Sequence, residues 1–450
     1  MARVVLIESF VKQLRVPFFE GLIQYLQPRG VDLQVIFGQP DRFHAPDGDI
    51  VQELSFATKI HNTYINCGQT SLLWQPAMKY LKGADLVIVR QSNRNILNHL
   101  LVLTRELLGF KLAFFGHGKN FQSLDPDSLA EKFKRFYSRR ADYWFAYNDR
   151  SKAVLRRMGF PDDRITSVQN AIDVTKLIDA YDNITPAQTQ ALRSQLGIST
   201  GDHAGVYCGR FYRDKDIDFT LYCAKRIHLR DGRFHFVLIG EGEEAQKVQA
   251  FCQSNSTWAH YVGPCYSQDR ARFFRLARCQ IMPGVVGLSI IDSFAMLTPL
   301  ITRENPRHGP EIDYLRDGWN GLLTDESAQA YISEVVRYMN DPACQKKLVR
   351  GCLESRTQYT VENMVQRFGE GICKALAITG RNGQARQRCV GIHERGVRPI
   401  LAVLSHPRTG FITYAEPRCD LFDKKRPDAR KADDDIPCYG MSRRPDDADG

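Results

Sequence analysis

Short apolar segments rich in β-branched residues alternate with segments of helical periodicity along most of this chain. The alternation occurs in two successive series, one from ARVVLIES near the N-terminus to FKLAFFGHG at 110–118, and another from HAGVYCGRF at 203–211 to TPLITRE at 298–304. Apolar runs of this length are typical of strands buried on both faces, and strands that alternate with helices form parallel sheets. The sequence therefore predicts an α/β protein with two doubly wound, Rossmann-like sheets.

The length of the chain also favours two domains, because 450 residues exceed the roughly 250 to 300 residues at which a single hydrophobic core stops growing. We place one domain at residues 1–180 and another at 181–355, with a polar, capped helix at 182–200 that is typical of a linker. Residues 356–378 form a further predicted amphipathic helix. In the tail, 379–450, the composition changes to Arg, Asp, Pro and Gly, so we expect disorder there.

Composition narrows the classes of function. No run of about 18 apolar residues occurs, and the start MARVVLIESF does not fit a secretion signal, so we expect a cytoplasmic protein. The 12 cysteines are scattered singly, as expected for reduced and buried thiols, and their spacing does not predict a zinc site. The formal net charge of +10 suits nucleic acid, an anionic membrane face or a phosphorylated substrate equally well. Nucleic acid is not an expected partner, because no DNA- or RNA-binding motif is recognised.

Two cations follow the first predicted strand of the second domain. In VYCGRFYRDKDIDFT this strand runs into Gly209, and Arg210 and Lys215 follow it closely. A departing diphosphate needs such partners, because Arg offers a planar fork of donors and Lys a point charge. Spacing alone fits a solvated charged loop equally well.

A second segment, MPGVVGLSIIDSFAMLTPLIT, reads as a strand, a Pro-Gly loop and the start of a helix. Backbone N–H groups at a helix start, here at Gly287, Leu288 and Ser289, form a site for anions. Asp292 follows one turn later, where a carboxylate can accept hydrogen bonds from ribose hydroxyls. The alternative is that Asp292 only interacts with the helix dipole.

Five segments in this order resemble glycosyltransferase family 4, a family of retaining enzymes with the GT-B fold. They are QNAIDV at 169–174, YCGRFYRDK at 207–215, LIGEGEE at 238–244, YVGPC at 261–265 and MPGVVGLSIIDSFA at 282–295. The resemblance, which runs from residue 3 to about 375, implies two Rossmann-like domains facing a central cleft. The first would bind the acceptor and the second the nucleotide sugar, with helix 356–378 returning to the first. The implied activity is transfer of a hexosyl or related sugar, with retention, from a nucleotide-diphosphate sugar to a hydroxyl of a glycan or lipid-linked acceptor in cell-surface polysaccharide or lipopolysaccharide synthesis.

The resemblance also assigns roles and exposes departures. Arg210 and Lys215 would bind the donor pyrophosphate and stabilise the departing nucleotide. Asp292 stands at the second glutamate of the family's paired-glutamate motif, which contacts the ribose, whereas Gly284 replaces the first glutamate. No DxD motif ends a predicted strand, so we expect neither a metal nor another cofactor. The expected donor-binding residues are Gly209, Arg210, Lys215, Gly240, Gly287, Leu288, Ser289 and Asp292.

The loop ENPRHGPEIDYLRDGWNGLL resembles the family's sugar-facing loop but carries two extra residues, so Glu311 and Asp313 compete for one position. With His308 and Gly309, these residues are the sugar-facing candidates that would replace the contact missing at Gly284. The third catalytic candidate beside Arg210 and Lys215 is His117, which follows a strand between two glycines and could hydrogen-bond the sugar or acceptor as a neutral imidazole. A lone histidine is more often structural.

Some alternatives stay open at this stage. The segment SLAEKFKRFYSRRADYW at 128–144 interleaves cations with aromatic residues and fits either an anionic membrane surface or an amphipathic core helix. The glycine-rich loop that follows the first strand in related enzymes is absent, and Lys12 and Arg15 are candidates for part of its electrostatic task. A nucleotide-sugar epimerase or phosphorylase fits the motif order less well. A homologue that binds nucleotide sugar or protein partners without turnover is the non-enzymatic alternative.

Overall fold

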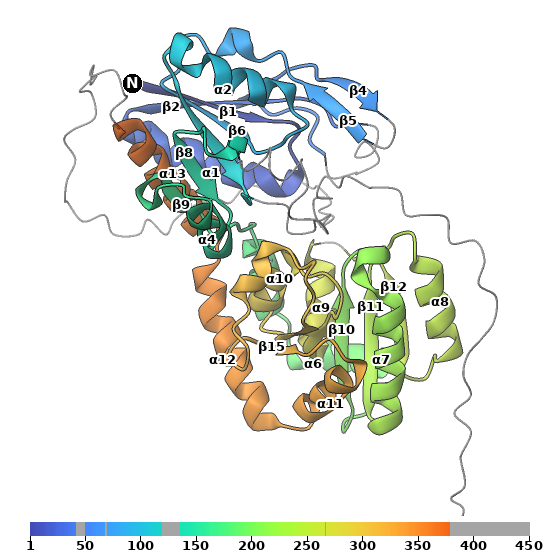
Figure 1. Ribbon diagram of the computed structural model, residues 1–450. Helices are drawn as coiled ribbons and strands as arrows, with labels where there is room; N and C mark the ends of the chain where they lie inside the picture. Colours follow the sequence, from blue (N-terminus) through green and yellow to red (C-terminus); the bar gives the residue numbers. More distant parts are fainter. Residues whose placement is uncertain (42–49, 68–69, 119–135, 266, 379–450) are drawn as a thin grey trace, which may run out of the picture.

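The computed structural model describes residues 1–41, 50–67, 70–118, 136–265 and 267–378. These residues form two α/β domains that lie one above the other in Figure 1. The tail from 379 to 450, and the part of the basic and aromatic segment before residue 136, fall outside the described residues. In the described part of the chain, no helix has the length and apolar character needed to cross a membrane.

The first domain is built on a seven-stranded sheet in which every neighbouring pair is parallel, in the order β3-β2-β1-β6-β7-β8-β9. The strands are continuous apolar runs because helices cover both faces; Val4 and Val5, which point to opposite faces of β1, are both fully buried. The strands are β1 (Ala2–Glu8), β2 (Val31–Phe37), β3 (Ala57–Lys59), β6 (Leu86–Arg90), β7 (Lys111–Gly116), β8 (Tyr143–Ala146) and β9 (Ile165–Ser167). A separate antiparallel hairpin joins β4 (Thr63–Cys67) to β5 (Thr70–Trp74).

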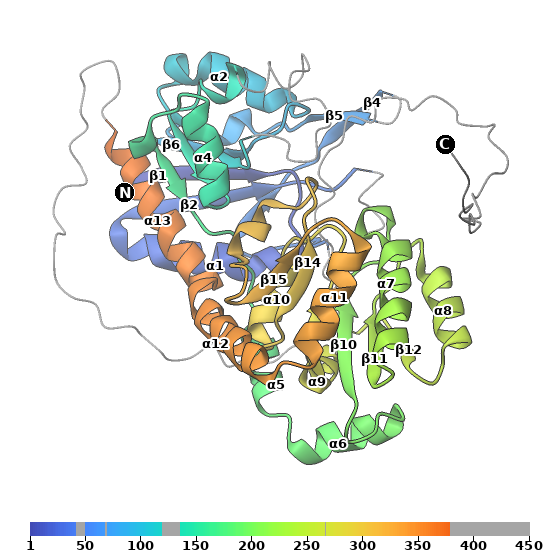
Figure 2. The same ribbon diagram turned by 60° about the horizontal axis from the view of Figure 1, so that its bottom comes forward.

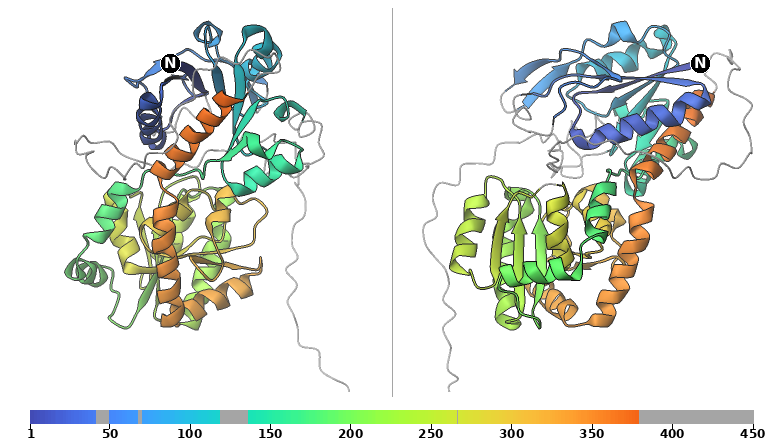
Figure 3. Two further views of the ribbon diagram at one scale, coloured as in Figure 1. Left: turned by 90° about the vertical axis from the view of Figure 1, so that its left-hand side faces the viewer. Right: turned by 180° about the vertical axis from the view of Figure 1, so that it is seen from behind.

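Two helical layers sandwich this sheet. One core contains residues of α2 (Ile96–Leu108) and α4 (Asp149–Arg157), and the other contains residues of α1 (Val16–Leu26) and α13 (Val361–Ala377). The last described helix, α13, packs on α1 (Figure 3), and its Phe368 ring stacks on Phe145 of β8 with 4.1 Å between centroids. The end of the described chain therefore belongs to the core of the first domain.

The second domain repeats the plan with a six-stranded parallel sheet in the order β12-β11-β10-β13-β14-β15. Its helix α7 packs against α8 and α11, and α5 and α6 pack against α9. Figure 2 shows α12 and α13 following one another along one side of the molecule, from the second domain to the first. The strands are β10 (His203–Cys208), β11 (Phe234–Ile239), β12 (Ala259–Gly263), β13 (Ala277–Ile281), β14 (Leu300–Arg303) and β15 (Gly321–Thr324). The helices are α5 (Thr175–Asp182), α6 (Pro186–Gln195), α7 (Ile217–Arg230), α8 (Ala245–Ser254), α9 (Ala271–Leu276), α10 (Ser289–Ala295), α11 (Ala328–Met339) and α12 (Pro342–Gln358).

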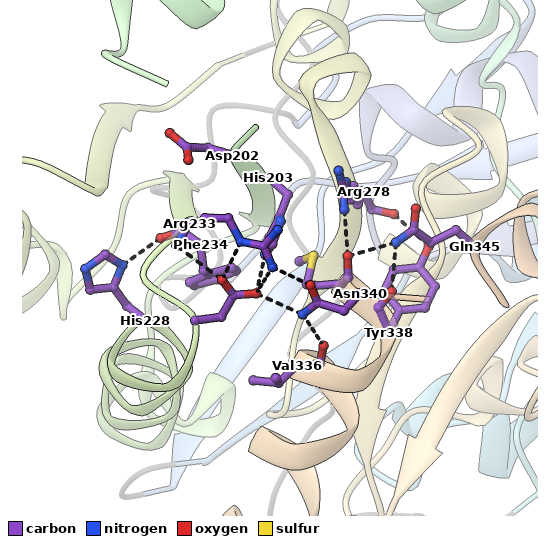
Figure 4. A network of polar contacts seen from close by, with 12 residues as sticks. Asp202, His203, His228, Arg233, Phe234, Arg278, Val336, Tyr338, Asn340 and Gln345 are labelled. Carbon is purple, nitrogen blue, oxygen red and sulfur yellow. Dashed lines mark hydrogen bonds and ion pairs between the residues drawn. The ribbon is translucent and has the colours of Figure 1, made fainter. Parts of the chain in front are cut away.

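A polar network closes the amino-terminal edge of the second sheet (Figure 4). The carboxylate of Asp231 accepts hydrogen bonds from Arg233 Nε (3.0 Å) and Asn340 Nδ2 (2.8 Å), and His203 Nε2 lies 3.1 Å from it. Burial alone raises the pKa of Asp231, but the hydrogen bonds from Asn340 and Arg233 outweigh it and lower the pKa to about 2. Burial lowers the pKa of His203 to about 4, and burial together with the neighbouring His235 lowers that of His260 to about 4.

The low pKa values of His203 and His260 make the free energy of unfolding decrease on mild acidification. Below the ordinary histidine pKa of 6.5 these histidines become protonated in the unfolded chain, whereas in the folded chain they stay neutral until about pH 4. The free energy of unfolding therefore decreases as the pH falls across this window. We expect the free energy of unfolding to fall by roughly 1 to 2 kcal/mol per pH unit between about pH 6 and pH 4. Urea unfolding at a series of pH values measures the slope, and His203→Gln should make it shallower. Constant stability across this range would contradict the prediction.

Candidate functional site

An open pocket lies at the carboxyl edge of the second sheet, where β10, β11 and β13 end. Its empty volume, which includes open solvent at the mouth, is about 780 Å³. Leu14, from the first domain, lines one side, so the pocket lies where the two domains meet. Of the predicted donor-binding residues, only Gly287 is not in its lining; Gly209, Arg210, Lys215, Gly240, Leu288, Ser289 and Asp292 all line it.

The two glycines of this edge allow the loops after β10 and β11 to touch. Gly240 has φ +148°, and a Cβ there would lie 1.9 Å from the carbonyl oxygen of Gly209. The Gly209 N–H donates to the carbonyl of Ile239 (3.0 Å), which extends the pairing of the two strands into the loops. Any larger residue at position 240 would push the Arg210 loop away from the sheet.

Lys215 ends a short 3-10 turn (Arg213–Lys215) that is clamped to the loop after β13. Its side chain is buried, and its Nζ donates to the carbonyl of Val285 (2.6 Å) while also lining the pocket. The Val285 N–H donates back to the carbonyl of Asp214 (3.1 Å), and Arg307 forms an ion pair with Asp214 (2.9 Å). The two loops that carry the predicted donor-binding residues therefore form one fixed unit.

Gly284 lies directly against the backbone of Lys215. A Cβ built on Gly284 would lie 2.1 Å from the carbonyl oxygen of Lys215, far inside van der Waals contact. Loss of the family's first glutamate is therefore built into the packing, because the backbone of Lys215 fills the space a side chain would need.

Asp292 forms a buried, bidentate ion pair with Arg270, with both N···O distances at 2.9 Å. Burial raises the pKa of Asp292, and the Arg270 charge opposes that rise. Both side chains line the pocket. The sequence prediction missed Arg270, which lies 22 residues before Asp292 and just before α9. A carboxylate has about four lone-pair sites, so Asp292 keeps acceptor capacity beyond this pair.

The ring of His308 forms hydrogen bonds with backbone groups at both of its nitrogens. Its Nδ1 accepts a hydrogen bond from the Val286 N–H (3.0 Å), so the ring is neutral and Nε2 donates to the carbonyl of Arg303 (2.8 Å). Both ring nitrogens pair with backbone groups, so neither is directed at a sugar in this arrangement, and the sugar-facing role of His308 stays a prediction. The side chain holds two loops together.

Glu311 and Asp313 differ in their exposure to solvent. Glu311 is buried, and its Oε1 accepts from Asn170 Nδ2 (2.9 Å) of the first domain, whereas Asp313 is exposed. A Cβ on Gly309 would lie 2.8 Å from Glu311 Oε2, so the glycine makes room for this carboxylate. Glu311 thus lies at the domain junction, Asp313 points outward, and none of the sugar-facing candidates is in the lining of the described pocket.

A chain of polar side chains lies along the carboxyl edge of the first sheet. Arg90 Nε donates to Glu8 Oε2 (2.8 Å), and its Nη1 donates to the Tyr147 hydroxyl. The Tyr147 ring meets the edge of His117, with 3.9 Å between centroids. These residues end or follow β1, β6, β8 and β7, where ligands bind in parallel α/β sheets. The sequence prediction named only His117, although polar residues after apolar strands would have pointed to Glu8 and Arg90 as well.

Arg15 is placed at the domain junction. Its Nη1 donates to the carbonyl of Ala171 (3.1 Å), and burial lowers its pKa. Lys12 is also buried. Of residues 12–15, Leu14 is the one that lines the pocket, so the loop after β1 contributes an apolar side chain to it.

Comparison with known proteins agrees with this architecture. A family model described as glycosyl transferases group 1 matches residues 203–341. No curated protein sequence matches this chain significantly. A glycosyltransferase from Rickettsia africae ESF-5 is similar with a TM-score of 0.60 at 13% identity, over 84% of this chain and 99% of that one. Anabaena Alr3699/HepE in complex with UDP gives 0.58 at 14% identity, over 83% and 100%. The apo form of the lipopolysaccharide outer core galactosyltransferase WaaB gives 0.58 at 13% identity, over 82% and 99%. The shared fold confirms the predicted two-domain GT-B architecture.

Proposed function

We propose that this protein is a retaining glycosyltransferase that moves a sugar from a nucleotide-diphosphate sugar to a hydroxyl group of a glycan or lipid-linked acceptor. The proposal depends on one observation, the pocket between the domains that Arg210 and Lys215 line from one loop and Leu288 and Ser289 from another. The match of residues 203–341 to glycosyl transferases group 1 supports it. So do the UDP and UDP-glucose complexes of the structurally similar Anabaena protein.

The proposed reaction needs charge stabilisation more than a protein base. The bond from the anomeric carbon to the diphosphate oxygen breaks, and the acceptor oxygen bonds to the same face of that carbon. The acceptor proton passes to the departing phosphate oxygen. Arg210 and Lys215 meet the negative charge that develops on the diphosphate, and Asp292, held by Arg270, accepts hydrogen bonds from the ribose.

We assign the acceptor to the carboxyl edge of the first sheet. His117 hydrogen-bonds a hydroxyl of the sugar or acceptor, and Tyr147, held by Arg90, fixes the orientation of its ring. The similarity to WaaB supports a place in lipopolysaccharide or other cell-surface polysaccharide synthesis, at the inner face of the cytoplasmic membrane.

A second candidate is a homologue that binds a nucleotide sugar without turnover. Gly284 favours it, because a glycine at this position cannot make the contact that the first glutamate of the resembled family makes with the donor sugar. Glu311 lies at the domain junction, where it accepts from Asn170. The two candidates differ in whether the bound donor is consumed.

Thermal unfolding with a panel of nucleotide sugars, followed by a nucleoside diphosphate release assay, separates these functions. A bound donor raises the melting temperature because it binds the folded chain only. The transferase predicts both a rise and release with acceptor present, whereas the binding protein predicts a rise alone. If no nucleotide sugar shifts the melting temperature, both candidates are wrong.

We expect transfer to continue without divalent metal. Arg210 and Lys215 are assigned the neutralisation of the diphosphate, and within the described residues no group of three or more His, Cys, Asp or Glu side chains is placed to hold an ion. Initial rates after treatment with EDTA should match those with added Mg²⁺ or Mn²⁺. A loss on EDTA treatment that either metal restores would contradict this assignment.

A further inference from the structure

Helix α2 carries leucines on its outer side as well as its inner side. Leu97 and Leu101 are fully buried against the first sheet, whereas Leu103 and Leu107 are 75% and 87% exposed. Positions 103 and 107 are one helical turn apart and project from the same side. A surface helix ordinarily turns polar residues toward water, so this outer side is apolar surface that a partner would cover.

An aromatic and basic segment adjoins this side of α2. Phe136 is 57% exposed, and the guanidinium of Arg140 lies 4.2 Å above its ring. Tyr137 anchors the segment, because its buried ring packs 4.7 Å from His99 of α2. Arg139, like Arg140, is exposed. We call this surface the α2 face: Leu103, Leu107, Phe136, Arg139 and Arg140.

The α2 face carries a local excess of positive charge. Arg105 forms ion pairs with Glu106 (3.6 Å) and Asp142 (3.7 Å), so Arg105, Arg139 and Arg140 together exceed these two carboxylates by one positive charge. Among the described residues, no carboxylate forms an ion pair with Arg139 or Arg140. Exposed leucines with an aromatic ring and two arginines at their margin match the chemistry of an anionic lipid surface.

We propose that the α2 face docks this protein on an anionic lipid bilayer. Leu103, Leu107 and Phe136 enter the boundary between headgroups and acyl chains, while Arg139 and Arg140 stay level with the lipid phosphates. A second copy of the chain suits this face less well, because pairing it with itself brings four arginines together. The inference rests on the proposed function in one respect, that the bilayer supplies the lipid-linked acceptor.

Sedimentation of the full-length protein with vesicles tests the α2 face directly. Vesicles of phosphatidylcholine mixed with phosphatidylglycerol should bind the protein more strongly than phosphatidylcholine alone. We expect Leu103→Ser/Leu107→Ser to weaken partitioning about tenfold, because two apolar side chains are lost from the interface. Arg139→Glu/Arg140→Glu should weaken it about tenfold or more and remove the preference for the anionic lipid. Leu229→Ser is the matched control, since Leu229 is 66% exposed on α7 of the second domain and should leave binding unchanged.

The outcomes are distinct. Equal vesicle binding by the wild type and both double variants overturns the proposal. So does a dimer in solution, measured by light scattering, that Leu103→Ser/Leu107→Ser dissociates, because the face then belongs to a second copy. Loss of vesicle binding with an unchanged donor-induced rise in melting temperature supports it. If the wild type binds vesicles through this face but binds no nucleotide sugar, the proposed function fails while the docking surface stands.

Discussion

Replacing Arg210 and Lys215 together lowers turnover about 10⁴-fold or more, the largest loss we expect from any pair of side chains in this protein. Removing one preorganised donor from a developing negative charge typically costs about 10²- to 10³-fold in kcat, and both cations act on the same departing diphosphate. Both line the pocket, and Lys215 is buried in the turn that is clamped to the loop after β13. Arg210→Ala with Lys215→Met keeps the volume of the buried side chain while removing both charges.

The control for this loss lies in the same turn. Arg213 is exposed and is not in the lining of the pocket, so Arg213→Ala should keep near wild-type turnover. Lys215 also donates to the carbonyl of Val285, so thermal unfolding of each variant must show that the fold survives. Nucleoside diphosphate release measures turnover. A double variant within tenfold of the wild type would show that the two cations do not stabilise the leaving group.

Gly284→Glu should weaken donor binding, although it places a glutamate where the resembled family has one. The new Cβ would lie 2.1 Å from the Lys215 carbonyl oxygen and 2.7 Å from its Cα, and backbone atoms cannot rotate away as a side chain does. The turn must shift and carry Lys215 with it. Overpacking of this kind costs about 1 to 3 kcal/mol of stability or more, and we expect donor affinity to fall at least about tenfold.

Two alanine variants separate the packing effect from the chemistry of a carboxylate. Gly284→Ala meets the same backbone atoms and should also lose stability and donor affinity, whereas a Cβ on Gly232 meets nothing within 4 Å, so Gly232→Ala should behave like the wild type. Urea midpoints and donor dissociation constants measure the two effects. Wild-type stability and faster turnover in Gly284→Glu would instead mean that the turn is free to move.

The fold could be predicted because its elements are strongly patterned. The apolar run ARVVLIE became β1 and HAGVYC became β10, each opening a parallel sheet. The pocket at the edge of the second sheet could be predicted for a related reason. Gly209 and Gly240 directly follow β10 and β11, and the carboxyl ends of parallel strands meet at one edge, so residues distant in sequence gather there.

The remaining features depend on tertiary contacts that leave no periodic signal. The Arg270–Asp292 pair arises from the packing of the segment before α9 against α10. His308 resembles a ligand-binding residue in the sequence, but backbone groups from two other segments occupy its ring. Glu311 and Asp313 have the same chemistry two residues apart. Glu311 is the one that is buried, where it accepts a hydrogen bond from Asn170 of the other domain.

Release of nucleoside diphosphate from a panel of nucleotide sugars, measured with and without acceptor, most directly tests whether the pocket between β10 and α10 holds a sugar donor. We predict that one nucleotide class is bound and consumed, with release stimulated by acceptor and lost in Arg210→Ala/Lys215→Met. If no nucleotide sugar is bound or consumed by the intact protein, or if release is indifferent to these two cations, the pocket is not a donor site.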